Sequence, residues 1–311
     1  MRAEGVRVAQ NGAVPAALPH LSSRLLGALA AVVVAAAALS GCAATPPSGT
    51  GLGGLAPAAI PARSAAAAVA ATTVTVVDEP HTSSVLLVPA HPRALAVFVH
   101  GSGQTHDAIL TIDHDRAVAQ ELARHGYVVL ATDAGGRAWG DPASVEDYER
   151  LITSTESRYD VHQVDLVAES MGGLATMQLA ARMQDVAAVT AWYPVCDLRT
   201  MEHKPAFAAA ITKAWAGADR SAVSPVQVPP VPMMVWASPD DTVVDASRNA
   251  ALCVTEGRAA GGSVISIRTT GNHGDPSNFH PAEVLAFFDA HLAPRNGIRT
   301  AVEKSSAIPR P

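Results

Sequence analysis

The sequence predicts an α/β fold in which a mostly parallel sheet of about eight strands is flanked by helices. Two observations support this prediction. From Val74 onward, short runs rich in β-branched residues alternate with longer segments of helical periodicity. Several of the inner runs are apolar throughout, as expected for strands that helices cover on both faces of a sheet.

The individual elements follow from this alternation. The expected strands are Val74–Val77, Val85–Val88, Ala94–Val99, Tyr127–Thr132, Val164–Ala168, Ala188–Trp192, Val231–Ala237 and Val264–Thr269. The expected helices are Ala108–His125, Ser144–Ser157, Met171–Met183, Pro205–Ala216, Asp245–Ala259 and Pro281–Leu292. The opening strands are the candidates for antiparallel pairing. Active sites in such sheets lie beyond the carboxyl ends of the strands, so the residues after each strand are the candidates for function.

Composition limits the class of protein. The 311 residues are 49% hydrophobic but only 4% aromatic, which is enough apolar material for one large domain or two small ones. The net charge is −6 at pH 7, and Lys and Arg are scattered. Because no basic stripe stands out, a nucleic-acid-binding surface is not expected.

The N-terminal segment 1–41 has the pattern of an export signal. Arg2, Arg7 and Arg24 precede an apolar run that is short for a membrane-spanning helix. The run ends in Leu39-Ser40-Gly41-Cys42, which resembles a bacterial lipobox. That resemblance implies cleavage before Cys42, a lipid on its thiol, and anchoring at the outer face of the cytoplasmic membrane. The alternative is a plain transmembrane or secretory segment with an incidental cysteine.

The rest of the chain divides by composition. Residues 42–73 are mainly Ala, Pro, Gly, Ser and Thr and are expected to form a flexible tether. Residues 74–293 form the predicted domain, and residues 294–311 a loose tail. Cys196 and Cys253 could form a disulfide in an exported protein or remain two buried thiols. Neither has a spacing typical of zinc ligands.

Four of the expected strands are followed by polar or glycine-rich loops. These are His100-Gly101-Ser102-Gly103, Glu169-Ser170-Met171-Gly172-Gly173, Asp240-Asp241-Thr242-Val243-Val244 and Asn272-His273-Gly274-Asp275. Their order resembles that of the α/β-hydrolase superfamily, namely oxyanion loop, serine, acid and histidine, over roughly Val74 to Leu292. The resemblance implies an α/β-hydrolase fold with a Ser-His-Asp triad.

Ser170 is the candidate nucleophile. Its surroundings, A-x-S-x-G, differ from the family's usual G-x-S-x-G by Ala168, which is also small, and some bacterial lipases are similar. Small residues on both sides allow the sharp turn that brings strand and helix close. Ser170 could instead be a helix N-cap, but a cap needs no small neighbours.

The base and the acid each have competitors. His273 follows the last strand, as the family pattern requires, whereas His280 precedes Pro281 and suits a helix entry. Asp241, followed by an apolar pair, resembles the family's acid loop, and it would orient the imidazole and stabilise its charged form. Asp240 and Asp197 remain the alternatives.

The resemblance also implies an oxyanion hole. Met171, the residue after the nucleophile, would supply one backbone N–H, and Ser102 between two glycines the other. His100 is expected to be structural. Asn272, Trp139 and His106 could line the pocket or be ordinary packing residues.

The sequence contains no motif that predicts a cofactor or a metal site. There is no G-x-G-x-x-G or Walker pattern. Asp113-His114-Asp115 could suggest a metal cluster, but the expected helix there favours a solvated face. We therefore expect no cofactor, no metal site and no nucleic-acid partner.

The expected activity is ester hydrolysis by a lipid-anchored enzyme. An alkoxide leaves more readily than an amine, so a small-molecule or polymer-end acyl ester is the expected substrate. The insert at 196–230 has room for one short helix, so only a minimal lid and a fairly open pocket are expected. The alternatives are a peptidase or amidase of the same fold and a binding lipoprotein without catalysis.

Overall fold

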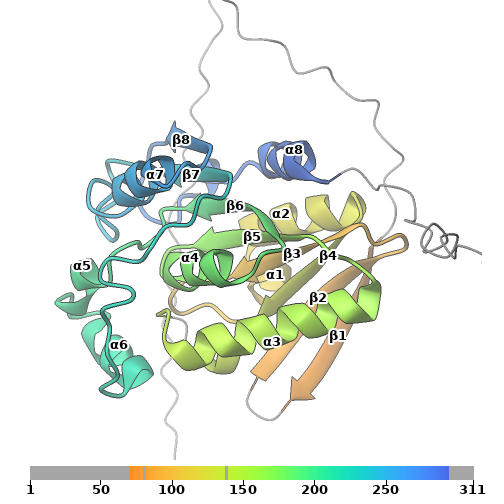
Figure 1. Cartoon of the computed structure of the whole chain (residues 1–311), viewed down its shortest axis with the longest axis horizontal. Coiled ribbons are helices and arrows are strands. Elements are labelled where there is room, and N and C mark those ends of the chain that lie inside the picture. The colour runs from red at the N-terminus through yellow and green to blue at the C-terminus, as the bar shows by residue number, and fades with distance from the viewer. Residues whose placement is uncertain (1–70, 80–81, 137–138, 294–311) are drawn as a thin grey trace, which may run out of the picture. The chain divides into compact units, whose positions relative to one another are not determined.

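The computed structural model describes residues 71–79, 82–136 and 139–293 (Figure 1). The predicted signal peptide 1–41, Cys42 and the tail 294–311 lie outside the described residues. So does the predicted tether, except for residues 71–73, which belong to the first strand. Among the described residues, no helix has both the length and the apolar character needed to cross a bilayer.

Eight strands of the described chain form one sheet, in the order β1-β2-β4-β3-β5-β6-β7-β8. Their bounds are β1 Ala71–Glu79, β2 Thr82–Pro89, β3 Ala94–Val99, β4 Tyr127–Thr132, β5 Val164–Glu169, β6 Val186–Trp192, β7 Met233–Ala237 and β8 Val264–Arg268. The β1–β2 and β2–β4 pairs are antiparallel, and all the remaining pairs are parallel. The predicted fold class, a mostly parallel sheet of the α/β-hydrolase type, is confirmed.

The helices depart from the expected segments in three places. Their bounds are α1 Ala108–Thr111, α2 Asp113–Arg124, α3 Pro142–Tyr159, α4 Gly172–Arg182, α5 Arg199–Glu202, α6 Ala208–Trp215, α7 Ala250–Ala259 and α8 Pro281–His291. The first expected helix is split because Ile112 adopts an extended conformation. α7 starts at Ala250, since Asp245 caps a preceding turn by accepting the Ser247 N–H. The insert at 196–230 holds two short helices, α5 and α6, where one was expected.

Helices cover both faces of the sheet, which explains its all-apolar inner strands. Along β3, Leu95, Val97 and Val99 pack in the core beneath α3, α4 and α7 (Figure 1). The alternate residues Ala96 and Phe98 pack in a second core with α2 and α8. All six residues of β3 are therefore buried, and the sheet holds the loops at its carboxyl edge on a rigid base.

A disulfide joins the segment after β6 to α7. Cys196 and Cys253 are bonded, with their Cα atoms 6.0 Å apart and neither residue exposed. Beside this bond, the Asn249 side-chain oxygen accepts the backbone N–H of Cys196 at 3.1 Å and that of Asp197 at 3.2 Å. The structure thus decides between the two alternatives that the sequence left open for these cysteines.

Candidate active site

The parallel strands bring four loops to one edge of the sheet. The loops after β3, β5, β7 and β8 carry His100, Ser170, Asp241 and His273, respectively. Because these strands run parallel to one another in a single sheet, their carboxyl ends point the same way. The four loops therefore meet although they are far apart in the sequence.

Ser170 lies on a sharp turn between β5 and α4. Its φ of 53° is in the left-handed region, which non-glycine residues rarely adopt. The turn packs against neighbouring backbone: a Cβ on Gly172 would lie 2.1 Å from the Val99 carbonyl oxygen. A Cβ on Gly173 would lie 2.7 Å from the Val195 oxygen. Both glycines are therefore required by close approach.

The backbone of Ser170 is held on both sides. Its N–H donates to the Trp192 oxygen at 3.1 Å, and its carbonyl accepts from Val195 at 2.8 Å and Gly173 at 3.1 Å. The alternative reading of Ser170 as a helix cap is not supported by its position. The N-cap of α4 is Met171, and no side chain caps the helix.

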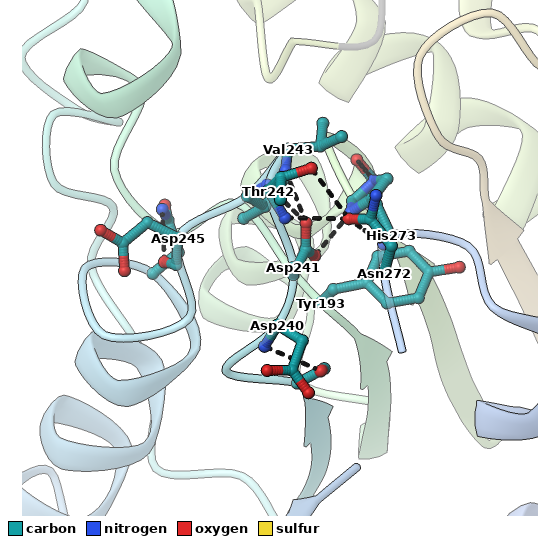
Figure 2. Close-up of polar contacts among 12 residues, drawn as sticks. Tyr193, Asp240, Asp241, Thr242, Val243, Asp245, Asn272 and His273 are labelled. Carbon is teal, nitrogen blue, oxygen red and sulfur yellow. Dashed lines mark hydrogen bonds and ion pairs between the residues drawn. The ribbon is translucent and has the colours of Figure 1, made fainter. Parts of the chain in front are cut away.

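The Ser170 hydroxyl belongs to a chain of three side chains. The Nε2 atom of His273 lies 2.9 Å from Ser170 Oγ. Its Nδ1 lies 2.7 Å from Asp241 Oδ2 (Figure 2). With the proton on Nδ1, the imidazole donates to the carboxylate and accepts from the serine hydroxyl. In this state Nε2 can take the proton of Ser170, which is the role of a general base.

Of the three candidate acids, the structure brings only Asp241 to His273. Its side chain is 1% exposed, and its second oxygen accepts the N–H groups of Val243 at 2.8 Å and Val244 at 2.9 Å. Asp240 is exposed and its carboxylate points away from His273 (Figure 2). Asp197 is instead paired with the Arg199 guanidinium through both oxygens.

Two side chains tie the acid loop to the histidine loop: Asn272, which the sequence offered only as a pocket-lining or packing residue, and Ser238, to which it gave no role. The Asn272 Oδ1 accepts from both the N–H and the hydroxyl of Thr242, at 2.9 and 3.0 Å, and from the N–H of His273 at 2.8 Å. Ser238 donates its hydroxyl to the Gly271 oxygen at 2.7 Å. These bonds set the distance between Asp241 and the imidazole.

Two backbone donors near the nucleophile are candidates for an oxyanion hole, one in the loop after β3 and one in the turn after β5. The Gly101 N–H is used, because it donates to Gln104 Oε1 at 2.6 Å. Within the described part of the chain, the N–H groups of Ser102 and Met171 donate to no protein acceptor. The His100 Nδ1–H donates to the Gly101 oxygen at 2.9 Å, which agrees with a structural role.

The other candidate residues take part in local packing. His280 precedes the first residue of α8, as expected for a helix entry. Trp139 is buried and packs against Phe207, with ring centroids 5.4 Å apart. His106 is bound to Asp133 at 2.9 Å through its ring. In the described chain none of these three side chains has a contact with the serine.

The expectation of a solvated face at residues 113–115 is wrong for Asp115, which is 3% exposed. α2 turns Asp115 and His114 toward Glu169, and one ligand atom from each of these three residues lies within 4.8 Å of the others. Such a trio could hold a metal ion. However, burial and the neighbouring Glu169 raise the pKa of Asp115 to about 8, so it is mainly protonated at neutral pH. A metal ion would therefore have to displace this proton on binding.

Comparisons with known proteins show the family and the fold of this chain. The family described as serine aminopeptidase, S33, matches residues 90–269. A Mycobacterium phage D29 protein, provisionally named a non-heme haloperoxidase, is 34% identical over 93 residues. That stretch covers 28% of this chain and 30% of the phage protein, so the chain spans under a third of that relative.

Similar solved structures extend over most of the chain. An esterase of Pyrococcus furiosus has a TM-score of 0.54 at 16% identity and covers 72% of this chain and 94% of its own. An acylaminoacyl peptidase of Pyrococcus horikoshii has a TM-score of 0.55 at 13% identity, covering 74% of this chain and 43% of its own. At such identities the likeness shows the fold alone.

Proposed function

The chain belongs to the serine aminopeptidase S33 family of hydrolases, and on that premise we propose that it cleaves carboxylic esters through an acyl-enzyme on Ser170. One observation carries the proposal: a single imidazole, that of His273, lies within hydrogen-bond distance of both the Ser170 hydroxyl and the buried Asp241 carboxylate. This arrangement is what nucleophilic catalysis by serine requires.

The reaction follows from the contacts. His273 Nε2 takes the proton as Ser170 Oγ attacks the ester carbonyl, and Asp241 stabilises the imidazolium that forms. The N–H groups of Ser102 and Met171 would donate to the oxyanion, each contributing about 3 kcal/mol. The imidazolium then gives its proton to the leaving alkoxide. Water, deprotonated by the same imidazole, attacks the acyl-enzyme. The bond from the acyl carbon to Ser170 Oγ then breaks, Oγ regains the proton from the imidazolium, and the acid is released.

Esters are preferred over amides on chemical grounds. An alkoxide is a better leaving group than an amine. Cleavage of an ester therefore needs less stabilisation from the oxyanion donors and from the general acid. Within the insert at 196–230, the described helices are the four residues of α5 and the eight of α6. So small an insert supports an open site for a small acyl ester or a polymer end.

The test uses Ser170→Ala with Ser154→Ala as its matched control, since Ser154 is exposed on α3. We expect the wild type and Ser154→Ala to hydrolyse p-nitrophenyl acetate and to react with a fluorophosphonate probe. Ser170→Ala should lose at least about a thousandfold in kcat and all labelling. Labelling that persists in Ser170→Ala would refute the assignment of the nucleophile.

The same assays separate the alternatives. Faster turnover of an aminoacyl p-nitroanilide than of the matched ester would identify a peptidase, the activity named in the family's description. A wild-type protein that neither turns over an ester or anilide nor reacts with the probe would be a binding protein.

We further propose that the protein is exported and anchored by a lipid on Cys42, because residues 39–42 resemble a lipobox. Metabolic labelling with an alkynyl fatty acid should mark the wild type and the Ser48→Ala control in the membrane fraction. Cys42→Ala should be unlabelled. A Cys42→Ala protein that is still labelled would contradict the anchor.

A further inference from the structure

Glu169, the last residue of β5, directly precedes the nucleophile and uses both of its carboxylate oxygens. Its Oε2 accepts from Gln104 Nε2 at 2.8 Å, and its Oε1 accepts from the Tyr193 hydroxyl at 3.0 Å. These two donors come from different loops, one after β3 and one after β6. A single carboxylate therefore connects two loops that border Ser170.

The first connection reaches the oxyanion loop. Gln104 makes two hydrogen bonds to Gly101 that close this loop. Its side-chain Oε1 accepts the Gly101 N–H at 2.6 Å, and its backbone N–H donates to the Gly101 oxygen at 3.2 Å. Because Gln104 Nε2 donates to Glu169, the carboxylate sets the orientation of the amide that holds Gly101. Ser102 follows Gly101, so the direction in which the Ser102 N–H points depends on the hydrogen bonds between Gln104 and Gly101.

The second connection reaches the base. The Tyr193 ring lies against the His273 imidazole, with centroids 4.3 Å apart and planes inclined by 54° (Figure 2). Tyr193 is 3% exposed, so the surrounding atoms leave little freedom to its ring. Burial and the neighbouring Glu169 raise the pKa of the Tyr193 hydroxyl, which keeps it a donor.

We propose that Glu169 is a positioning residue, which holds the oxyanion loop through Gln104 and the His273 imidazole through Tyr193. The proposal rests on the proposed function, because it assigns Glu169 an effect on the reaction at Ser170. Glu169 does not touch the reacting atoms. It fixes the two groups whose placement within a fraction of an ångström decides the rate of acyl transfer.

The described surroundings of Glu169 supply two hydrogen-bond donors, and the side chains of His114 and Asp115 lie close to the same carboxylate. Its acidic neighbour Asp115 lacks any hydrogen-bond donor among the described residues, whereas Glu169 has two.

The first experiment compares Glu169→Ala with Glu169→Gln in p-nitrophenyl acetate hydrolysis. We expect Glu169→Ala to lower kcat about tenfold or more with KM within about twofold, since the acylation step loses its geometry. Glu169→Gln should keep kcat within about threefold, because its amide can still bond both partners. Glu149→Ala, which loses an exposed ion pair with Arg182, is the control and should match the wild type.

The second experiment is a double-mutant cycle with Gln104→Ala. If Glu169 acts partly through Gln104, the double variant should lose less in kcat than the product of the two single losses. A folded Glu169→Ala with wild-type kcat, a change confined to KM, or fully multiplicative losses would overturn the proposal. If Glu169→Ala does not fold, wild-type kcat in both Gln104→Ala and Tyr193→Phe would overturn it.

These outcomes are distinct from failure of the proposed function. In that case the wild-type protein would neither hydrolyse the ester nor react with the probe at Ser170. An active wild type with an unaffected Glu169→Ala would refute only the role of Glu169.

Discussion

The two halves of the candidate site are held by different forces. Ser170 is positioned by its backbone: a left-handed φ, hydrogen bonds from its own N–H and carbonyl, and no room for a side chain at Gly172. Asp241 and His273 are positioned mainly by side-chain hydrogen bonds, above all those of Asn272. The backbone half allows almost no substitution at its glycines, while the side-chain half depends on single polar atoms.

The largest effect should come from the side-chain half, with Asp241→Asn. The amide leaves the packing intact but offers the imidazole the wrong partner for its Nδ1–H, so we expect kcat to fall about 10³–10⁴-fold with little change in stability. Steady-state kinetics with p-nitrophenyl acetate, together with thermal unfolding, measure both quantities.

Asp240→Asn is the matched control for that change, because Asp240 is exposed and lies one residue away. It should keep kcat within about twofold. If Asp240→Asn were as damaging as Asp241→Asn, the acid would be wrongly assigned.

The backbone half can be broken by Gly172→Ala. The added Cβ would meet the Val99 carbonyl at 2.1 Å, so strand β3 or the turn must move. We expect the free energy of unfolding to fall by about 3 kcal/mol or more, with activity lost in the protein that still folds. Chemical denaturation measures the change.

Gly217→Ala separates this clash from backbone strain. Unlike Gly172, Gly217 has a positive φ, 85°, and no atom lies within 4 Å of its added Cβ. It should cost only about 1 kcal/mol and leave kcat unchanged. Equal losses in the two variants would show that the contact at Gly172 costs no more than the backbone strain at Gly217.

The difference between the halves also explains what the sequence could predict. Small residues around Ser170 are a local pattern, because the close approach of strand and helix acts on neighbours in the chain. The alternation of short apolar runs with helical segments likewise predicts the sheet, because a strand buried on both faces is apolar along its own sequence. The strands at Ala94–Val99 and Tyr127–Thr132 have the expected bounds.

Contacts between distant loops leave no such local pattern. The roles of Asn272, Gln104 and Tyr193 depend on partners tens of residues away, and Asp115 was expected on a solvated face although α2 turns it inward. The choice among Asp241, Asp240 and Asp197 was likewise open in the sequence. Only the fold shows which carboxylate reaches His273.

A pH-dependent effect on stability concerns the strand beneath the backbone half. Asp165 on β5 is fully buried, and burial raises its pKa to about 8 from an ordinary value of 3.8. Between these values the folded protein holds a proton that the unfolded chain has lost. Stability should therefore fall as the pH rises from about 4 to 8, by at most about 1.4 kcal/mol per pH unit for this group.

Asp165→Asn tests that expectation, since the amide mimics the protonated acid. Its free energy of unfolding, measured by urea denaturation from pH 4 to 9, should match the wild type near pH 4 and exceed it increasingly toward pH 8. Asp113→Asn, at an exposed carboxylate, should follow the wild-type curve. A variant curve parallel to that of the wild type would mean that Asp165 is ionised in the folded protein.

The smallest effect should follow from Asn272→Ala, which removes the acceptor shared by Thr242 and His273. Asp241 keeps its own bonds from Val243 and Val244, so the acid stays in place while the histidine loop gains freedom. We expect kcat to fall about tenfold with KM nearly unchanged. Asn272→Asp, which keeps the acceptor, should recover most of this loss at neutral pH. If Asn272→Ala retained full activity, the side-chain half would be held by its backbone as firmly as the turn at Ser170.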